Sequence, residues 1–171
     1  MIHIVLYQPE IPQNTGNIMR TCLATNTTLH LIEPLGFKLS EKEVKRSGAN
    51  YINEVHYILY PDITSFFEKN KGEFYFLSRY GMKTIYDVDT ADSSKDYYFI
   101  LGKESTGIPK EILQENLSKT IRLPMSDKVR ALNLSNVAAI MVYEALRQQG
   151  FPDLSFLEPD SLKGHDYLIK K

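Results

Sequence analysis

The sequence predicts an α/β fold with a mostly parallel sheet, and two observations carry this prediction. Short apolar segments rich in β-branched and aromatic residues alternate along the chain with segments of helical periodicity. Polar loops that contain glycine follow several predicted strands, where ligands bind in such sheets. With 171 residues, 43% hydrophobic and 24% charged, the chain suits one globular domain. We place this domain at residues 1–152 and treat residues 153–171 as a C-terminal tail.

The first elements are a strand, a helix and a second strand. Residues 2–7, IHIVLY, form an apolar β-branched run that Gln8 and Pro9 end. Asn14 is predicted to cap a helix that begins at Thr15, because apolar residues at helical spacing follow it. Residues 28–33 predict the next strand.

The middle of the chain continues the alternation. Ser40 and Glu43 form a capping-box pattern, which predicts a short charged helix. A helix is expected near residues 63–68, and further strands are expected at residues 55–59, 74–77 and 97–101.

The last predicted helix spans residues 134–149 and ends at Gly150. Its centre, VAAIMVYEAL, is apolar on more than one face, which is typical of a helix buried on all sides. In so small a domain a second subunit could supply the outer cover, so we predict a homodimer with this helix in its interface. A helix enclosed by the core of one chain remains the alternative.

Charge and side-chain chemistry exclude several functions. The net charge is −1, which argues against a general nucleic-acid binder but leaves room for a local basic patch. Cys22 is the sole cysteine and the four histidines lack the spacing of ligands, so neither a disulfide within the chain nor a metal site is expected. No signal peptide or membrane-length apolar run is found. We therefore expect a cytoplasmic protein without membrane contact.

The first notable loop is PEIPQNTGNIMRTC, residues 9–22, directly after the first strand. The backbone amides around Asn14 lie at a predicted helix start, where an anion is stabilised, and Arg20 projects from the first turns. Plain helix capping with a solvated Arg20 is the alternative.

The second loop is ILGKESTGIP, residues 100–109. It lacks the glycine and the Ser or Thr of a phosphate loop, and it lacks the middle glycine of a dinucleotide fingerprint. Gly102 and Gly107 predict close backbone approach, with Lys103 and Glu104 on the loop. A simple strand-to-helix turn, with Pro109 starting the helix, would also explain it.

The third loop is IRLPMSDKVRALNLSN, residues 121–136. It joins a short apolar strand, a proline turn and the last helix. Four basic residues stand against one acidic residue between Lys119 and Arg130, so the loop is locally basic.

In this order the three loops resemble the signature motifs of the SPOUT-class RNA 2′-O-methyltransferases. The segment LHLIEPLGF and the ending NLSNVAAIMVYEALRQ are most similar to the small members that methylate wobble cytidine or uridine of tRNA. The resemblance covers residues 1–152. It implies a Rossmann-like sheet with a C-terminal trefoil knot, an exception to the rule against knots. It further implies S-adenosyl-L-methionine as cofactor, tRNA as substrate and a homodimer with shared active sites.

The resemblance also implies catalytic residues. An arginine at the position of Arg20 activates the ribose hydroxyl in this family, and Asn14 and Glu104 match residues that shape the pocket. Asn133 and Ser135 match the third motif and are expected at the methyl-transfer end. Because a guanidinium stays protonated, we expect Arg20 to orient a phosphate and stabilise the alkoxide, while a phosphate oxygen or a carboxylate takes the proton.

The remaining site residues follow from the same match. Leu77, Gly102, Leu123 and Ala131 correspond to cofactor-binding positions. Ala131 replaces a serine common in the family, so it is not expected to act in catalysis. Candidates for RNA contact, each of which a solvated surface would also explain, are Lys42, Lys45, Arg46, Lys103, Lys128, Arg130 and Tyr143.

Other functions remain open. Methylation of a different tRNA or rRNA ribose would need the same motifs. A catalytically idle RNA-binding module of the same fold is disfavoured, because binding alone would not need Asn14, Arg20, Glu104 and Asn133 together. An NAD-dependent dehydrogenase is excluded by the missing glycine fingerprint.

Overall fold

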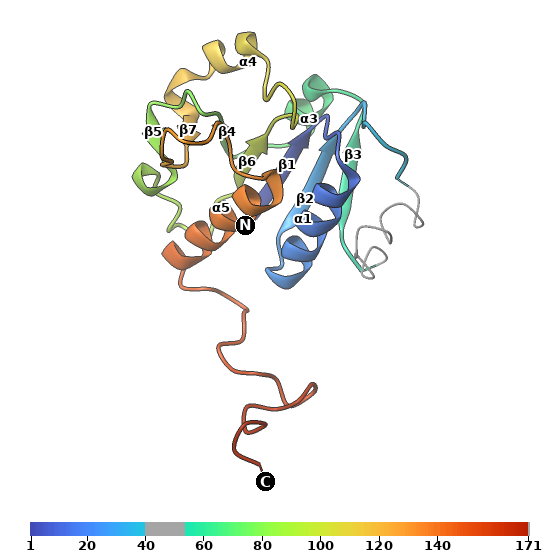
Figure 1. Ribbon diagram of the computed structural model, residues 1–171, viewed down its shortest axis with the longest axis vertical. Helices are drawn as coiled ribbons and strands as arrows, with labels where there is room; N and C mark the ends of the chain where they lie inside the picture. The colour runs from blue at the N-terminus through green and yellow to red at the C-terminus, as the bar shows by residue number, and fades with distance from the viewer. Residues whose placement is uncertain (40–53, 171) are drawn as a thin grey trace.

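The computed structural model describes residues 1–39 and 54–170, and these form one seven-stranded parallel sheet with helices on both faces (Figure 1). The strand order is β3-β2-β1-β6-β4-β7-β5, which confirms the predicted α/β class. The strands are β1 (Ile2–Tyr7), β2 (Thr28–Ile32), β3 (Tyr57–Tyr60), β4 (Glu73–Leu77), β5 (Lys83–Thr84), β6 (Tyr97–Leu101) and β7 (Thr120–Arg122). The helices are α1 (Pro12–Ala24), α3 (Ile63–Lys69), α4 (Lys110–Glu115) and α5 (Leu134–Gln148), with 3-10 turns η1 (Ile85–Asp87) and η2 (Leu117–Lys119).

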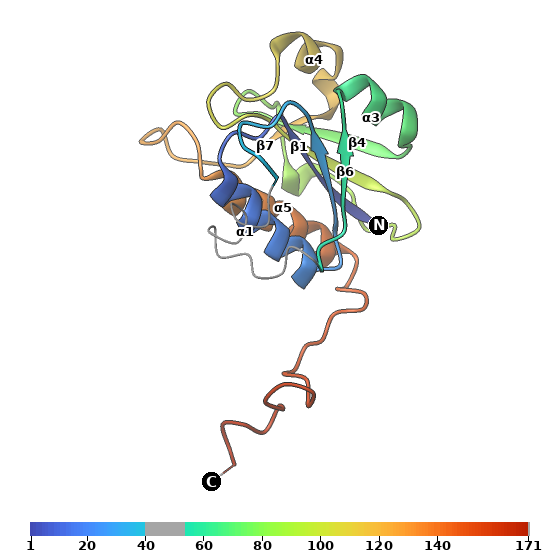
Figure 2. The same cartoon turned by 90° about the vertical axis from the view of Figure 1, so that its right-hand side faces the viewer.

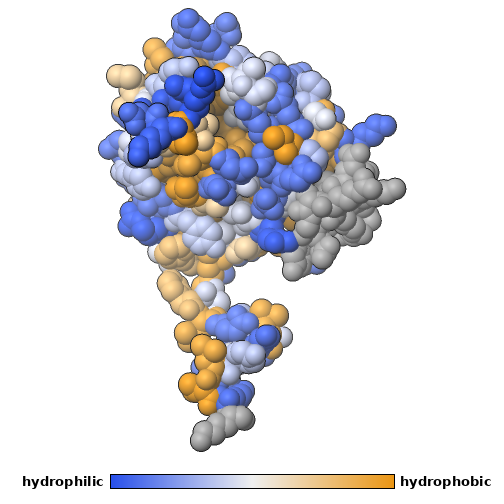
Figure 3. Space-filling model, in the orientation of Figure 1, coloured by the Kyte–Doolittle hydropathy of each residue, from blue (hydrophilic) through white to orange (hydrophobic). Residues whose placement is uncertain are grey.

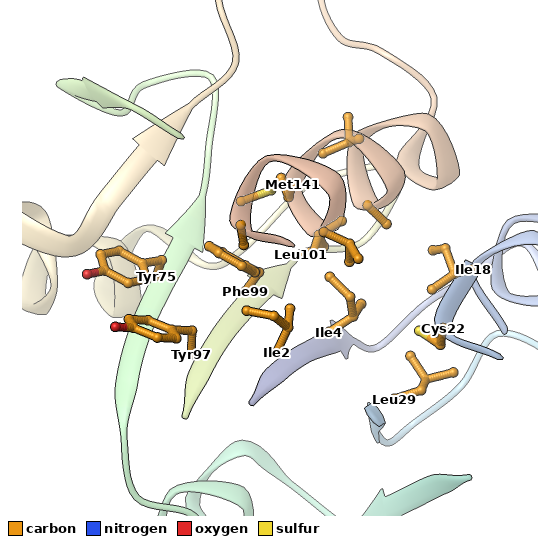
Figure 4. Close-up of a cluster of buried hydrophobic side chains, with 14 of the residues drawn as sticks. Ile2, Ile4, Ile18, Cys22, Leu29, Tyr75, Tyr97, Phe99, Leu101 and Met141 are labelled. Atoms are coloured by element: carbon orange, nitrogen blue, oxygen red, sulfur yellow. The ribbon is translucent and has the colours of Figure 1, made fainter. Parts of the chain in front are cut away.

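The sheet separates two hydrophobic layers because successive residues of a strand point to opposite faces. Ile4 and Leu6 of β1 pack into the layer under α1 and α5, whereas Val5 packs into the layer that includes side chains of α3 and α4. Figure 2 shows α1 and α5 together on one face, with α3 and α4 on the other. Figure 4 shows the first layer, in which Phe99 of β6 and Met141 of α5 lie close together. Strands that are apolar at nearly every position therefore indicate a sheet with helices packed on both faces.

The start of α1 differs from the sequence prediction. The helix begins at Pro12, and Ile11 rather than Asn14 is its N-cap residue, without a side-chain cap. Proline suits this first position because its fixed φ is helical and the amide hydrogen that it lacks would have no partner within the helix. Asn14 thus lies inside the first turn, buried, and its amide is available for contacts outside the helix.

Other element boundaries differ by one or two residues from those predicted. The strand expected at residues 55–59 is β3 at Tyr57–Tyr60, and the strand at residues 28–33 ends at Ile32. The two-residue strand β5 and both 3-10 turns were not predicted. The helix expected from Ser40 and Glu43 lies outside the described residues.

An unusual crossing joins β4 to β5. The two strands are consecutive in sequence, yet β7 lies between them in the sheet. The connection at residues 78–82 therefore passes over β7, and the Ser78 N–H donates to the Ile121 carbonyl at 2.9 Å. A Cβ on Gly81 would lie 2.4 Å from the Ile121 carbonyl carbon, so only glycine fits this crossing.

Helix α5 buries one face in this chain rather than all of its surface. Val137, Met141 and Val142 are buried, whereas Ile140 and Tyr143 are exposed. The alternative of a helix enclosed by the core of one chain is therefore wrong. The exposed residues recur at helical spacing and form one stripe, which consists of Asn136, Ile140, Tyr143 and Arg147.

The tail beyond Gly150 leaves the body of the protein (Figure 1). It contains turns but no helix or strand up to Lys170. Phe151 lies next to Tyr143 of α5, with ring centroids 6.5 Å apart, and Phe156 packs on Phe151. Only the first part of the tail is therefore tied to the domain by aromatic contacts.

A buried chain of polar side chains crosses the layer between the sheet and α3. His3 bonds the Asp96 carboxylate through Nε2 (3.3 Å) and His30 through Nδ1 (3.0 Å), and His30 Nδ1 lies 2.9 Å from the Tyr60 hydroxyl. A carboxylate only accepts, so His3 donates to Asp96 through Nε2. Burial disfavours the charged form of both rings, and with both neutral, His30 donates to His3 and accepts from the Tyr60 hydroxyl. Burial is the main cause that lowers both pKa values, that of His30 to about 3.

These two histidines predict an acid-sensitive fold. An unfolded histidine titrates near 6.5, so between that pH and the folded pKa the unfolded state binds more protons and stability falls as the pH falls. From pH 6 to pH 5, His30 alone lowers the free energy of unfolding by about 1 kcal/mol. Urea unfolding at several pH values measures this slope. His165→Ala, at an exposed site, should leave the slope unchanged, and equal stability at pH 6 and pH 5 would contradict the assignment.

Candidate catalytic centre at the carboxyl edge of the sheet

Three side chains from the three sequence motifs meet in one hydrogen-bonded cluster. Asn14 in the first turn of α1 donates from Nδ2 to Glu104 Oε1 at 3.0 Å. Asn133, the N-cap residue of α5, donates from Nδ2 to Asn14 Oδ1 at 2.9 Å. Asn14 therefore links the loop after β6 to the start of α5. Residues 119 positions apart in sequence form this contact, which shows that the three motifs belong to one site.

The Glu104 carboxylate also fixes the start of α1. It accepts the backbone N–H of Glu10 at 2.8 Å and that of Ile11 at 3.3 Å. A helix leaves its first N–H groups without partners inside the helix, and a carboxylate is stabilised there by the helix dipole. Glu104 thus holds the backbone directly before and at the N-cap residue, while no side chain caps the helix itself.

A second carboxylate completes a reciprocal clasp. Glu10 accepts the backbone N–H and the hydroxyl of Ser105, both at 2.9 Å. The Ser105 hydroxyl, followed by its backbone N–H, lowers the pKa of Glu10. The sequence analysis did not single out Glu10 or Ser105. Each lies inside a motif: Glu10 directly follows Pro9, which ends the first strand, and Ser105 directly follows Glu104.

The loop that carries Glu104 is closed by its glycines. Lys103 and Gly107 exchange backbone hydrogen bonds of 3.2 and 2.9 Å across the loop. A Cβ on Gly102 would lie 2.2 Å from the Gly107 carbonyl carbon, and Gly107 has a φ of +74°. Gly102 therefore requires glycine because of close backbone approach, as the sequence predicted, whereas Gly107 favours glycine because of its positive φ.

Ser135 orients Asn133. Its backbone N–H and its hydroxyl both donate to Asn133 Oδ1, at 2.9 and 2.6 Å. With Oδ1 occupied, the Asn133 amide group turns its Nδ2 toward Asn14. Ser135 is buried and acts through Asn133.

Arg20 lies on a different face of α1 from Asn14. The exposed residues of this helix include Gln13, Asn17 and Arg20, which share one face, whereas Asn14 is buried. The structure thus brings Asn14, Glu104, Asn133 and Ser135 together and places Arg20 on the outer face of the same helix.

Three of the four expected cofactor positions lie at adjacent strand ends. Leu77 ends β4, while Gly102 and Leu123 directly follow β6 and β7, and these strands are neighbours in the order β6-β4-β7. Leu123 is buried and Leu77 packs on the same apolar cluster. Apolar walls beside free strand ends suit a purine ring with its polar edge toward the backbone. The fourth position, Ala131, lies in the exposed segment that projects after β7 (Figure 2).

The expected RNA contacts are spread over several elements. Lys103 is half-buried on the loop after β6, Lys128 and Arg130 are exposed in the segment after β7, and Tyr143 is exposed on α5. Lys42, Lys45 and Arg46 lie outside the described residues.

A cleft of about 260 Å³ lies apart from this cluster, against β4, β5 and β7. Two of its charged groups already have partners within the protein: Lys119 pairs with Glu73, and Asp87 accepts the Thr84 N–H at the start of η1. We therefore assign the chemistry to the hydrogen-bonded cluster rather than to this cleft. Across residues 1–39 and 54–170 no group of three potential metal ligands occurs, and no helix there is long and apolar enough to cross a membrane.

Solved structures with this architecture define the class of fold. A crystal structure from Bacillus anthracis, provisionally named an RNA methyltransferase, is 52% identical and superposes with a TM-score of 0.88 over 91% of this chain and 99% of that one. A second, concerned with 2-OH methylation of C/U34 on tRNA, is 38% identical, with a TM-score of 0.78 over 88% of this chain and 97% of that one. The SpoU methyltransferase AviRb from Streptomyces viridochromogenes, solved with AdoMet, shares the fold at 20% identity, a TM-score of 0.73, and coverage of 86% of this chain and 57% of that one.

Sequence comparison identifies the family within this class. The model of the SpoU rRNA Methylase family matches residues 1–143, and the chain belongs to this family. A Listeria monocytogenes protein, provisionally named a tRNA (cytidine(34)-2′-O)-methyltransferase, is 55% identical over 150 residues, 87% of this chain and 89% of its own length. The tRNA (cytidine(34)-2′-O)-methyltransferase of Escherichia coli is 39% identical over 154 residues, 89% of this chain and 96% of its own length.

Proposed function

We propose that the protein transfers a methyl group from S-adenosyl-L-methionine to the 2′-hydroxyl of the wobble ribose, cytidine or uridine 34, of tRNA. The observation that carries the proposal is the direct hydrogen bonding among Glu104, Asn14 and Asn133, which unites all three motifs at one edge of the sheet. The names of relatives that match nearly the whole domain give the same nucleotide and the same atom.

The reaction needs a positioned hydroxyl and a proton acceptor. When bound, S-adenosyl-L-methionine supplies an electrophilic methyl group, and Leu77, Gly102 and Leu123 would hold its adenine end. Arg20 binds a phosphate of the RNA and stabilises the developing 2′-alkoxide by its fixed charge. The new bond joins the 2′-oxygen to the methyl carbon as the bond from carbon to sulfur breaks.

Glu104 is better suited to orient the site than to accept the proton. Its Oε1 already accepts two hydrogen bonds, from Asn14 and Ile11, and its Oε2 accepts one from Glu10. A phosphate oxygen of the RNA, held by Arg20, is therefore the proton acceptor that we favour.

Two further structural properties belong to this proposal. The crossing of residues 78–82 over β7 supports a C-terminal trefoil knot, because the chain must pass beneath this connection before it reaches α5. The exposed stripe on α5 that contains Ile140 and Tyr143 supports a homodimer through this helix. Light scattering should then give twice the mass of one chain. With tRNA as its substrate, we place the enzyme in the cytoplasm.

Mass mapping of tRNA from cells that lack the protein tests the function. We expect one ribose methyl to disappear from nucleotide 34 of some tRNAs, and a plasmid that carries the gene should restore it. Purified protein should then methylate the same tRNA with S-adenosyl-L-methionine. A methylation map identical to that of the parent cells would overturn the proposal.

A further inference from the structure

An exposed turn at the carboxyl end of β4 presents an aromatic ring beside a cation. Residues Ser78 to Gly81 form a β-turn closed by the Gly81 N–H to the Ser78 carbonyl at 3.1 Å, with Arg79 and Tyr80 at its tip. Tyr80 is 74% exposed, and the Arg79 guanidinium lies 5.3 Å from the centre of its ring. Neither side chain takes part in the hydrogen-bonded cluster described above.

The backbone beneath these side chains is firmly held. The Ser78 N–H bonds the Ile121 carbonyl, the Tyr80 N–H bonds the Ser78 hydroxyl at 3.3 Å, and Gly81 lies directly against β7. The backbone that carries the Tyr80 ring is therefore fixed against β7. A rigid base with an exposed ring is the arrangement that favours stacking of a ligand, because little freedom is lost on binding.

The positive charge around the turn favours the binding of an anionic partner. Residues 78–84 contain Arg79 and Lys83 without an acidic residue. The neighbouring residues 122–130 contain Arg122, Lys128 and Arg130 against Asp127 alone. β5 and β7 are paired, with Thr84 opposite Arg122, so the two segments meet at this strand pair. Together they carry an excess of four positive charges. Figure 3 shows strongly hydrophilic side chains next to an apolar region on the side of the molecule where β5 and β7 lie.

We propose that Tyr80, with Arg79 beside it, is a stacking platform for an unpaired base of the substrate RNA, next to the methylated nucleotide. The inference rests on the proposed function and adds a specificity contact to it. Leu77, one of the expected cofactor residues, directly precedes this turn, so a base on Tyr80 lies close to the reacting ribose. An exposed aromatic ring flanked by cations is how proteins bind single-stranded nucleic acid, whose bases stack while its phosphates pair with the cations.

The test compares three variants with the wild-type protein. Binding of an anticodon stem-loop RNA is measured by fluorescence anisotropy, independently of methylation, and cofactor affinity is measured by calorimetry. Tyr80→Ala should weaken RNA binding by about tenfold, the usual loss for one stacked base, and leave cofactor affinity unchanged. Tyr80→Phe, which keeps the ring, should bind within about twofold of the wild type. Tyr86→Ala removes another exposed tyrosine from η1, outside the turn, and should bind as the wild type does.

Each alternative outcome has a definite meaning. RNA binding by Tyr80→Ala equal to that of the wild type overturns the stacking proposal, as does an equal loss in Tyr80→Phe, which would assign the effect to the hydroxyl. A parallel loss of cofactor affinity would instead place Tyr80 in the cofactor pocket. Wild-type protein that binds this RNA without methylating nucleotide 34 would refute the proposed function. The comparison of RNA binding between Tyr80→Ala and the wild type would still test the stacking contact separately.

Discussion

Replacing Arg20 by alanine is expected to lower the rate constant of methyl transfer at least 100-fold while cofactor affinity stays within about twofold. Arg20 lies on the exposed face of α1 and not at the strand ends that carry the expected cofactor positions, so its loss should not disturb cofactor binding. Removal of one fixed group that stabilises developing negative charge commonly costs two to three orders of magnitude. Single-turnover kinetics with saturating RNA measure the chemical step, and calorimetry measures cofactor binding.

Two variants give this experiment its controls. Arg20→Lys keeps the positive charge but loses the planar fork that grips a phosphate at two points, so it should retain only part of the rate. Lys71→Ala removes an exposed cation next to the amino end of β4, at the opposite edge of the sheet, and should react as the wild type does. A fall in cofactor affinity that matches the fall in rate would reassign Arg20 to the cofactor site. An unchanged rate would remove it from catalysis.

The sequence predicts the layers of this fold well because burial on both faces leaves a clear local signal. The run Ile2 to Tyr7 is apolar at successive positions, and the sheet indeed buries Ile4 and Val5 in different layers. The three motif loops are predicted to follow strands, and the structure brings side chains from all three together at one edge of the sheet. Both properties depend on the residues within one short segment.

What the sequence could not show depends on contacts between distant segments. Asn14, next to threonine and glycine, looks locally like a helix cap, but Glu104 reaches the helix start from 94 positions away and leaves Asn14 free to bond Asn133. The clasp between Glu10 and Ser105 and the passage of Gly81 across β7 have no local signal of this kind. The apolar composition of α5 was likewise insufficient to show which of its faces meets the sheet.

Replacing Glu104 by alanine is expected to lower the free energy of unfolding by about 3 kcal/mol and to abolish methyl transfer. The substitution leaves the N–H groups of Glu10 and Ile11 and the amide of Asn14 without their acceptor, and the bonds from Glu10 and Asn14 are part-buried. Hydrogen bonds to a charged acceptor contribute roughly 1.5 to 3 kcal/mol each, and water replaces some of them at the more exposed donors. Urea unfolding measures the loss of stability, which corresponds to a fall of about 10 °C in the melting temperature.

The isosteric variant separates stability from orientation. Glu104→Gln keeps one acceptor oxygen but turns an NH₂ group toward a donor, so one of the three hydrogen bonds becomes repulsive. It should lose about half as much stability as the alanine variant and still disturb the contact between Asn14 and Asn133. Glu111→Ala, at an exposed carboxylate in α4, should change stability by less than about 0.5 kcal/mol. If Glu104→Gln kept full stability and full activity, neither the charge of Glu104 nor its pattern of acceptors would matter. Asn14 and Asn133 would then be held by their backbones alone, and the cluster would not be the centre that we assign.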